Sequence, residues 1–343
     1  MRKLLNTLFI TTPESYLSLD GNNVVLLKEG KETFRIPVNN LEGIISFNYL
    51  GASPKLMQYC TENNILISFM SPSGRYMAGI NGKIRGNVLL RKKQYLSSVN
   101  KEFCLDISKV IIASKLYNSR VEICRSIRDN SDKIDVTNLE RAALGLKQSI
   151  SQIKNCCCAD DLRGLEGDSA RLYFSVFNDM VIQQKSDFVF CGRSKRPPLD
   201  NINAMLSFGY SLLAHDIEAA LLSVGLDPYV GFFHTDRPGR ISLALDIMEE
   251  FRAVFVDRFV LTLINLRQIN ASDFIKKESE GILLTDDARK TFLCEWQKKK
   301  QEEIIHPFSG EKIKIGLLPY MQALILSRYL REEINAYVPY YKR

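Results

Sequence analysis

The sequence predicts an α+β protein in which a small β-rich domain, residues 1–85, precedes a larger all-α domain, residues 96–343. Its length of 343 residues exceeds one typical domain. Over roughly the first 80 residues, short apolar runs and alternating stretches are separated by turn residues. Farther along, apolar residues recur every three or four positions, the period of a helix. Residues 86–95 are the predicted linker.

Short runs rich in β-branched, aromatic and leucine residues predict the strands of the first domain. These runs are residues 16–19, 24–27, 34–38, 44–47 and 65–69. The turn at residues 20–23 joins the first two runs as a hairpin. Pro37 predicts an edge position for its strand, because proline has no N–H to donate to a neighbour. Residues 55–60 could form a short helix.

The clearest helical pattern of the second domain runs from Ile241 to Ile264. Its apolar stripe consists of Ala244, Ile247, Phe251, Val254, Phe255 and Phe259. A second helical run, residues 212–224, contains His215 and Glu218, which we interpret as a surface pair. A further helix is expected to begin at Glu166.

Composition and cysteine spacing restrict the environment of the protein. The 46 Lys and Arg residues outnumber 39 Asp and Glu, and the net charge of +7 mildly favours an anionic partner such as nucleic acid. The eight cysteines form no CxxC pair, so we expect reduced thiols and a cytoplasmic protein. No apolar stretch approaches the length of a membrane-spanning helix, so no membrane association is expected.

A glycine-bounded loop with one histidine leads directly into the predicted helix at 241–264. His234 lies in this loop, and Asp246 and Glu249 lie three positions apart on one flank of the helix, outside its apolar stripe. If the loop folds back, one imidazole and two carboxylates converge. Such a set suits Mg²⁺ or Mn²⁺, and the imidazole favours Mn²⁺. The alternative is a solvated acidic face beside a capping histidine.

Two other segments have residues that could bind ligands. Glu166 lies between Gly164 and Gly167, which would let a bulky ligand approach its carboxylate. The alternative is an ordinary acid in the first turn of a helix. The basic residues Arg193, Lys195 and Arg196 precede a double proline. This loop could bind phosphates, or it could be an exposed turn.

Four segments in order resemble one known family. They are Leu165–Arg171, Arg193–Tyr210, Gly225–His234 and Asp246–Arg252. Together they resemble the CRISPR-associated spacer-acquisition integrase/endonuclease, the larger of the two universal adaptation proteins. The resemblance covers nearly the whole chain. The basic loop before the double proline is most similar to the I-C subtype.

The resemblance implies a set of site residues. The metal ligands of the family match Glu166, His234 and Glu249, and Asp246 matches a further acidic residue that supports the site. Arg240 and Arg252 match flanking arginines. We therefore expect DNA to contact Arg193, Lys195, Arg196, Arg240 and Arg252.

The resemblance also implies a reaction and partners. The expected reaction is attack of the 3′-hydroxyl of a short captured DNA on a phosphodiester of a CRISPR repeat, with Mg²⁺ or Mn²⁺ offsetting charge. Expected partners are double-stranded DNA, a second copy bound through the β-rich domain, and the small second adaptation protein. His234 must be neutral to bind a metal, so activity is expected to fall below pH ~6.5.

Two other functions use the same residues differently. A metal-dependent nuclease that cuts branched or single-stranded DNA in repair would use the same ligands, with water as the nucleophile. A non-catalytic scaffold that binds DNA would need none of the ligands. Joined DNA products distinguish an integrase from both alternatives.

Overall fold

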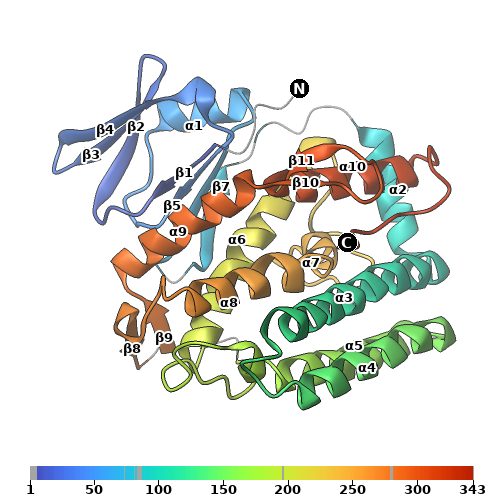
Figure 1. The fold of residues 1–343 in the computed structure, drawn as a ribbon. Helices are drawn as coiled ribbons and strands as arrows, with labels where there is room; N and C mark the ends of the chain where they lie inside the picture. The colour runs from blue at the N-terminus through green and yellow to red at the C-terminus, as the bar shows by residue number, and fades with distance from the viewer. Residues whose placement is uncertain are drawn as a thin grey trace. The chain divides into compact units, whose positions relative to one another are not determined.

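The structure is a computed structural model that describes residues 6–72, 74–80, 82, 87–194, 197–278 and 281–342. The chain divides into two compact units. Figure 1 shows the helices and strands coloured in the order of the chain. The smaller unit contains Met1–Arg85, Leu284–Glu302 and Lys314–Leu317, and the larger unit contains the remaining segments. Within the predicted linker, helix α2 begins at Val88 and belongs to the larger unit.

The strands of the smaller unit form two sheets. The first has the order β1-β5-β6-β7, in which β1, β5 and β6 are parallel and β7 is antiparallel to β6. The second has the order β2-β3-β4 and is antiparallel. Pro37 lies in β4 at an edge of the second sheet, which confirms the edge prediction. The strands are β1 (Thr7–Ile10), β2 (Ser15–Asp20), β3 (Asn23–Lys28), β4 (Lys31–Pro37), β5 (Gly43–Ser46), β6 (Leu66–Met70) and β7 (Tyr76–Ile80).

Both sheets share a core with helix α1 (Pro54–Glu62). The side chain of Ser53 accepts a hydrogen bond from the backbone N–H of Leu56 and so caps this helix. Leu56, Ile44 and Leu17 are fully buried in one apolar cluster to which α1 and both sheets contribute. The short helix expected at residues 55–60 is thereby confirmed.

The smaller unit also contains helix α9 (Asp286–Gln301), which the sequence had placed in the helical domain. The guanidinium of Arg289, 3% exposed, donates to the carbonyl of Pro72 at 3.0 Å and lies 5.8 Å from the ring centroid of Phe47. Gln297 donates to the carbonyl of Thr7. The smaller unit therefore does not end at residue 85, as the sequence predicted. It also includes a later segment, and these contacts link residues more than two hundred positions apart.

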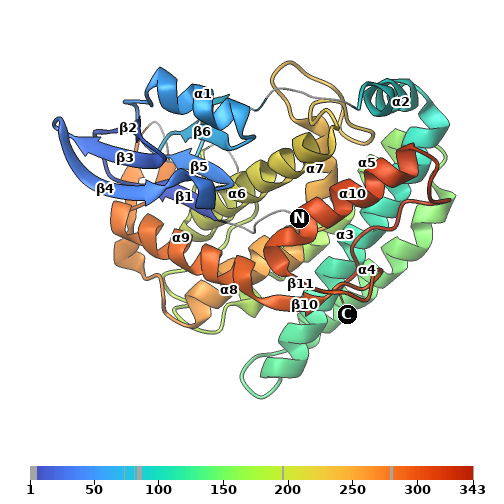
Figure 2. The ribbon, with the colours of Figure 1, turned by 90° about the horizontal axis from the view of Figure 1, so that it is seen from above.

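The larger unit is mainly helical. Helices α3, α4 and α5 pack against one another, and α6 packs against α10, as Figures 1 and 2 show. No helix in the described ranges is both long and apolar enough to cross a membrane. The helices are α2 (Val88–Ser98), α3 (Lys101–Asn130), α4 (Thr137–Gln152), α5 (Ala159–Ser175), α6 (Asn201–Val224), α7 (Ser242–Met248), α8 (Arg258–Asn265) and α10 (Leu318–Leu330).

The prediction of an all-α second domain is wrong in one respect. Strands β8 (Phe274–Lys277) and β9 (Gly281–Leu284) form a two-stranded sheet, and β10 (Glu303–Ile305) and β11 (Lys312–Lys314) form another. These strands have only three or four residues each, so the alternation of side chains repeats too few times to identify them in the sequence.

The predicted helix at 241–264 exists in three pieces. All six residues of its apolar stripe are buried, as expected. The helix is nevertheless discontinuous, because α7 ends at Met248, a π-helix spans Arg252–Asp257 and α8 follows. A π turn changes the backbone hydrogen bonds but leaves the apolar side chains in place, so the stripe does not reveal the break.

Two local expectations are wrong. His215 and Glu218 are 6% and 7% exposed rather than a surface pair, because α6 is buried on most sides. Glu166 does not start a helix, because α5 begins at Ala159 after the N-cap residue Cys158. Glu166 therefore lies in the middle of α5, beyond the first turn where the helix dipole acts.

Candidate metal centre

The ammonium group of Lys115, on α3, pairs with two of the predicted ligands. It contacts the carboxylate of Glu166 on α5, and its Nζ lies 2.7 Å from Oε2 of Glu249, the residue that caps α7. The side chains of Lys115, Glu166 and Glu249 are 13%, 23% and 4% exposed. Helices α3, α5 and α7 thus bring two carboxylates to one cation in a largely shielded position.

Asp246 holds the histidine loop in place. Its buried carboxylate accepts hydrogen bonds from the backbone N–H groups of Phe232, Phe233 and His234 at 2.6, 3.1 and 2.9 Å. Nδ1 of His234 lies 2.7 Å from Oδ1 of Asp246. An ionised carboxylate only accepts, so Nδ1 donates, and in a neutral ring Nε2 would then keep its lone pair. This Nε2 lies 3.9 Å from Oε1 of Glu249.

Gly231 allows the loop to wrap this closely around Asp246. A Cβ atom at this position would lie 2.8 Å from Oδ2 of Asp246 and 2.9 Å from the carbonyl carbon of Ser242. Neither contact is tolerated by a real side chain, and one of the two is with backbone. The glycine that bounds the loop is therefore required for its hydrogen bonds to Asp246.

Glu249 remains ionised although it is buried. Burial raises its pKa, but the positive charges of Arg252 and Lys115 outweigh burial and hold the pKa below its usual range. Nε of Arg252 lies 3.1 Å from Oε1. Nζ of Lys115 lies 2.7 Å from the other oxygen, Oε2.

A second layer of residues fixes Arg252. The ring centroid of Tyr210 lies 4.8 Å from the guanidinium carbon of Arg252 and 5.3 Å from that of Arg193. The hydroxyl of Tyr210 donates to the carboxylate of Asp257, at the end of the π-helix. Burial raises the pKa of Asp257 to about 6. The π-helix therefore supplies both ends of this support, Arg252 and Asp257.

The C-terminal segment, residues 337–342, reaches the residue next to Glu249. The carboxylate of Glu250 accepts from the backbone N–H of Tyr340 at 2.7 Å. Asn118, on α3, donates to the carbonyls of both Tyr340 and Glu250 at 2.8 Å. The segment therefore links α3, which bears Lys115, to the chain beside Glu249.

The predicted DNA-binding residues differ in whether their side chains are already engaged in contacts within the protein. The guanidinium of Arg193 donates to Oδ1 of Asn203 at 2.6 Å, and Arg252 pairs with Glu249, so both are engaged within the protein. Arg240 lies half-buried in the loop before α7. Lys195 and Arg196 lie outside the described residues.

The residue types present suit a divalent cation. Two carboxylates and an imidazole with a lone pair are donors that Mg²⁺ and Mn²⁺ accept. Oε2 of Glu249 belongs to a buried carboxylate, and the ammonium of Lys115 lies 2.7 Å from it. As the side chains stand, the described residues include no group of three His, Cys, Asp or Glu close enough to hold one ion, and Lys115 contacts both carboxylates. The donor set fits a metal once the carboxylates are released from Lys115.

Sequence reasoning missed Lys115. It belongs to no short motif, and it lies 51 residues before Glu166 in the chain. One signal was available, because polar residues recur every four positions on the neighbouring face of the long helix α3, at Ser114, Asn118 and Glu122. Buried polar residues at helical spacing indicate hydrogen-bonding partners rather than solvent.

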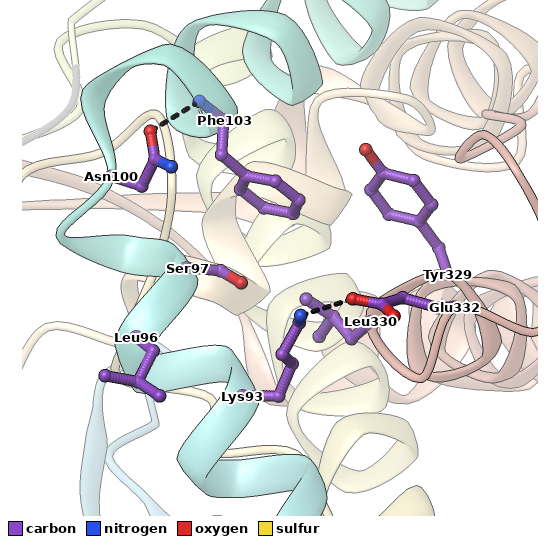
Figure 3. A pocket seen from close by; sticks show the side chains of 8 residues that line it. All are labelled: Lys93, Leu96, Ser97, Asn100, Phe103, Tyr329, Leu330 and Glu332. Carbon is purple, nitrogen blue, oxygen red and sulfur yellow. Dashed lines mark hydrogen bonds and ion pairs between the residues drawn. The ribbon is translucent and has the colours of Figure 1, made fainter.

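A separate cavity of about 350 Å³ lies where α2, the start of α3 and the end of α10 meet, as Figure 3 shows. Phe103 and Tyr329 stack on its wall with ring centroids 5.6 Å apart. Lys93 and Glu332 form an ion pair at 2.5 Å. None of the predicted site residues lines this cavity, so it is distinct from the candidate metal centre.

Comparisons with known proteins identify the family of the chain. The family model of CRISPR associated protein Cas1 matches residues 8–298. The chain belongs to the Cas1 family. A CRISPR-associated endonuclease Cas1 of Chlorobaculum tepidum is 44% identical over 340 residues, covering 99% of each chain.

Solved structures share the fold of this Cas1 chain. A casposase bound to integration product has a TM-score of 0.84 and 22% identity, over 98% of this chain and 94% of that chain. A chain of a Cas6-RT-Cas1–Cas2 complex has a TM-score of 0.82 and 23% identity, over 98% of this chain and 36% of that one. At these identities the likeness concerns the fold alone.

Proposed function

We propose that this Cas1 protein is a metal-dependent DNA integrase and endonuclease of CRISPR adaptation. It would insert short DNA at a CRISPR array through attack of a 3′-hydroxyl on a phosphodiester. The supporting observation is the convergence of Glu166, Glu249 and the Nε2 lone pair of His234, with Asp246 fixing the imidazole. Membership of a family whose matched relative is named an endonuclease supports the same reaction.

In this proposal the protein supplies position and charge. Glu166, His234 and Glu249 would hold Mg²⁺ or Mn²⁺, whose chemistry is to offset the charge of the phosphate in the transition state. Nδ1 of His234 lies 2.7 Å from Asp246, so in a neutral ring this contact would leave the lone pair of Nε2 for the metal. Arg252 and Lys115 contact different oxygens of Glu249. Arg252 contacts Oε1 and would orient the carboxylate, whereas Lys115 contacts Oε2.

The partners follow from the names of structural neighbours and remain part of the proposal. One neighbour is bound to an integration product and another belongs to a complex with Cas2, so we propose double-stranded DNA and the small second adaptation protein as partners. We also propose a homodimer formed through the β-rich unit, a cytoplasmic location and the I-C subtype. Arg193, Lys195, Arg196, Arg240 and Arg252 remain the predicted DNA contacts.

A strand-transfer assay tests the proposal. The protein, with and without its small partner, is incubated with a short 3′-hydroxyl duplex and a repeat-bearing plasmid in Mn²⁺, Mg²⁺ or chelator. We expect metal-dependent joined product that falls at least about a hundred-fold in Glu166→Gln and His234→Ala. Glu140→Gln, an exposed glutamate on the neighbouring α4, is the matched control and should join normally.

The other outcomes identify the alternatives. Cleavage without joining, lost in the same two variants, would identify the repair nuclease, in which water replaces the hydroxyl. DNA binding without either reaction, unchanged by the variants, would identify the scaffold.

A further inference from the structure

We propose that Lys115 is the cation that neutralises Glu166 and Glu249 until a divalent ion replaces it. Lys115 is therefore a positioning residue that competes with the metal for the same oxygens. This inference rests on the proposed metal-dependent function and adds to it a residue that no sequence motif contains.

The two carboxylates need a cation when no metal is bound. Glu249 is 4% exposed and Glu166 is 23% exposed, so water solvates their charges poorly. Like charges held near one another repel unless a cation lies between them. Among the described residues, Lys115 alone forms ion pairs with both, because Arg252 pairs only with Glu249.

The same contacts show why Lys115 can be exchanged. Its ammonium contacts Oε2 of Glu249, whereas Arg252 contacts Oε1 and would keep its place on that carboxylate if Lys115 moved. An ammonium is a point charge on a flexible four-carbon stem, so it can move away without displacing α3. The Lys115 side chain is 13% exposed, so it is not fully enclosed.

If Lys115 competes with the metal, replacing Lys115 should raise the affinity for metal, whereas replacing a ligand should lower it. Lys115→Met removes the charge and keeps an unbranched side chain. We expect it to bind Mn²⁺ roughly ten- to a hundred-fold more tightly than wild type, the range equivalent to losing one or two charge-assisted hydrogen bonds. Titration followed by the electron paramagnetic resonance of free Mn²⁺ measures this affinity without any DNA.

Thermal unfolding gives a second readout. Without metal, Lys115→Met should unfold at a lower temperature than wild type, because Glu166 loses this cation and Glu249 keeps only Arg252. Its midpoint should then rise more on adding Mn²⁺ than that of wild type. Lys115→Arg keeps the charge and should gain no affinity. Lys101→Met, at the exposed start of the same helix, is the matched control and should behave as wild type.

Several results would overturn the inference. Unchanged or weaker Mn²⁺ binding in Lys115→Met would do so, as would an equal gain in Lys115→Arg. Lys115→Gln repeats the test if the methionine variant does not fold. Failure of the metal proposal is distinguishable, because then Glu166→Gln and Glu249→Gln would bind Mn²⁺ as well as wild type does.

Discussion

Both oxygens of the Asp246 carboxylate bind the histidine loop. Oδ2 accepts from Phe232 and Phe233, and Oδ1 accepts from the backbone and the ring of His234. Asp246 therefore acts on the site through His234. The sequence suggested convergence of Asp246 with the other site residues, and the hydrogen bonds add the role of orienting the imidazole.

Asp246→Asn is expected to weaken the site while leaving its shape nearly unchanged. The asparagine amide group would face N–H donors with a donor of its own, so the loop would lose acceptors and the imidazole its fixed tautomer. We expect Mn²⁺ affinity to fall by about ten- to a hundred-fold, with a similar loss of joined product. Asp236→Asn, exposed in the same loop, is the control. Equal Mn²⁺ binding in both variants would contradict the orienting role.

Buried Glu218 predicts a dependence of stability on pH. Burial raises its pKa to about 7 from an ordinary value of 4.5. The folded protein thus keeps a proton that the unfolded chain loses. The contribution of Glu218 to the free energy of unfolding is therefore fully present below pH 4.5 and is lost as the pH rises through 7. Relative to Glu218→Gln, wild type should lose on the order of 1–3 kcal/mol of unfolding free energy over this window.

Thermal or urea unfolding at pH 5 and pH 8 measures this loss. Glu140→Gln, which removes an exposed carboxylate, is the control and should follow wild type at both values. If the difference between wild type and Glu218→Gln did not change with pH, Glu218 would not hold a proton in the folded state.

The site residues that sequence could identify are those in short motifs. Glu166, His234, Asp246 and Glu249 all lie in segments whose order and composition point to them. Lys115 could not be found this way, because its contact with Glu166 depends on how α3 packs against α5. Local patterns describe one helix at a time and do not give the partner of a buried charge.

At the scale of elements, the π-helix at Arg252–Asp257 connects the ligand region to its support. Each π turn contains more residues than an α turn, and such segments often occur at functional sites. Here the segment begins with the residue that pairs with Glu249 and ends with the residue that binds Tyr210. Its register therefore decides whether Arg252 reaches Glu249.

Deleting Ala253, a buried residue of the π-helix, is expected to convert the segment toward regular α-helix. Arg252 and Asp257 would then no longer face their present partners together. We expect circular dichroism to show helix content close to wild type, with joined product reduced at least about ten-fold. Full activity of the deletion variant would show that the register of this segment is unimportant.

The apolar stripe predicted helix over this region and predicted its buried face correctly. It could not predict the break after Met248, because the spacing of apolar residues does not determine which backbone hydrogen bonds form. The same limit applies to Glu166, whose helix starts seven residues earlier than the flanking glycines suggested.

At the scale of the whole molecule, the β-rich beginning and the helical remainder were predictable from periodicity. The assignment of α9 was not, because a helix packs wherever its apolar face finds a partner, at any distance along the chain. The Arg289–Pro72 and Gln297–Thr7 hydrogen bonds show that sequence order and spatial units differ here.

The C-terminal segment gives a prediction at the same scale. Ending the chain after Ala336 removes the donors that Tyr337 and Tyr340 offer to Glu250. A buried carboxylate without these partners is destabilising, so we expect a lower unfolding temperature and at least about a ten-fold loss of Mn²⁺ affinity. Glu333→Gln, exposed just ahead of the segment, is the control. Unchanged stability and metal binding would mean that the segment only covers the surface.

This arrangement also sets an order of events during synthesis. Asn118 and Glu250 leave the ribosome long before Tyr340, which satisfies both of them. A nascent chain that has been translated only as far as α10 already contains every predicted ligand but lacks the segment that joins α3 to Glu250. Chains that end before this segment should therefore bind metal less well than the full chain.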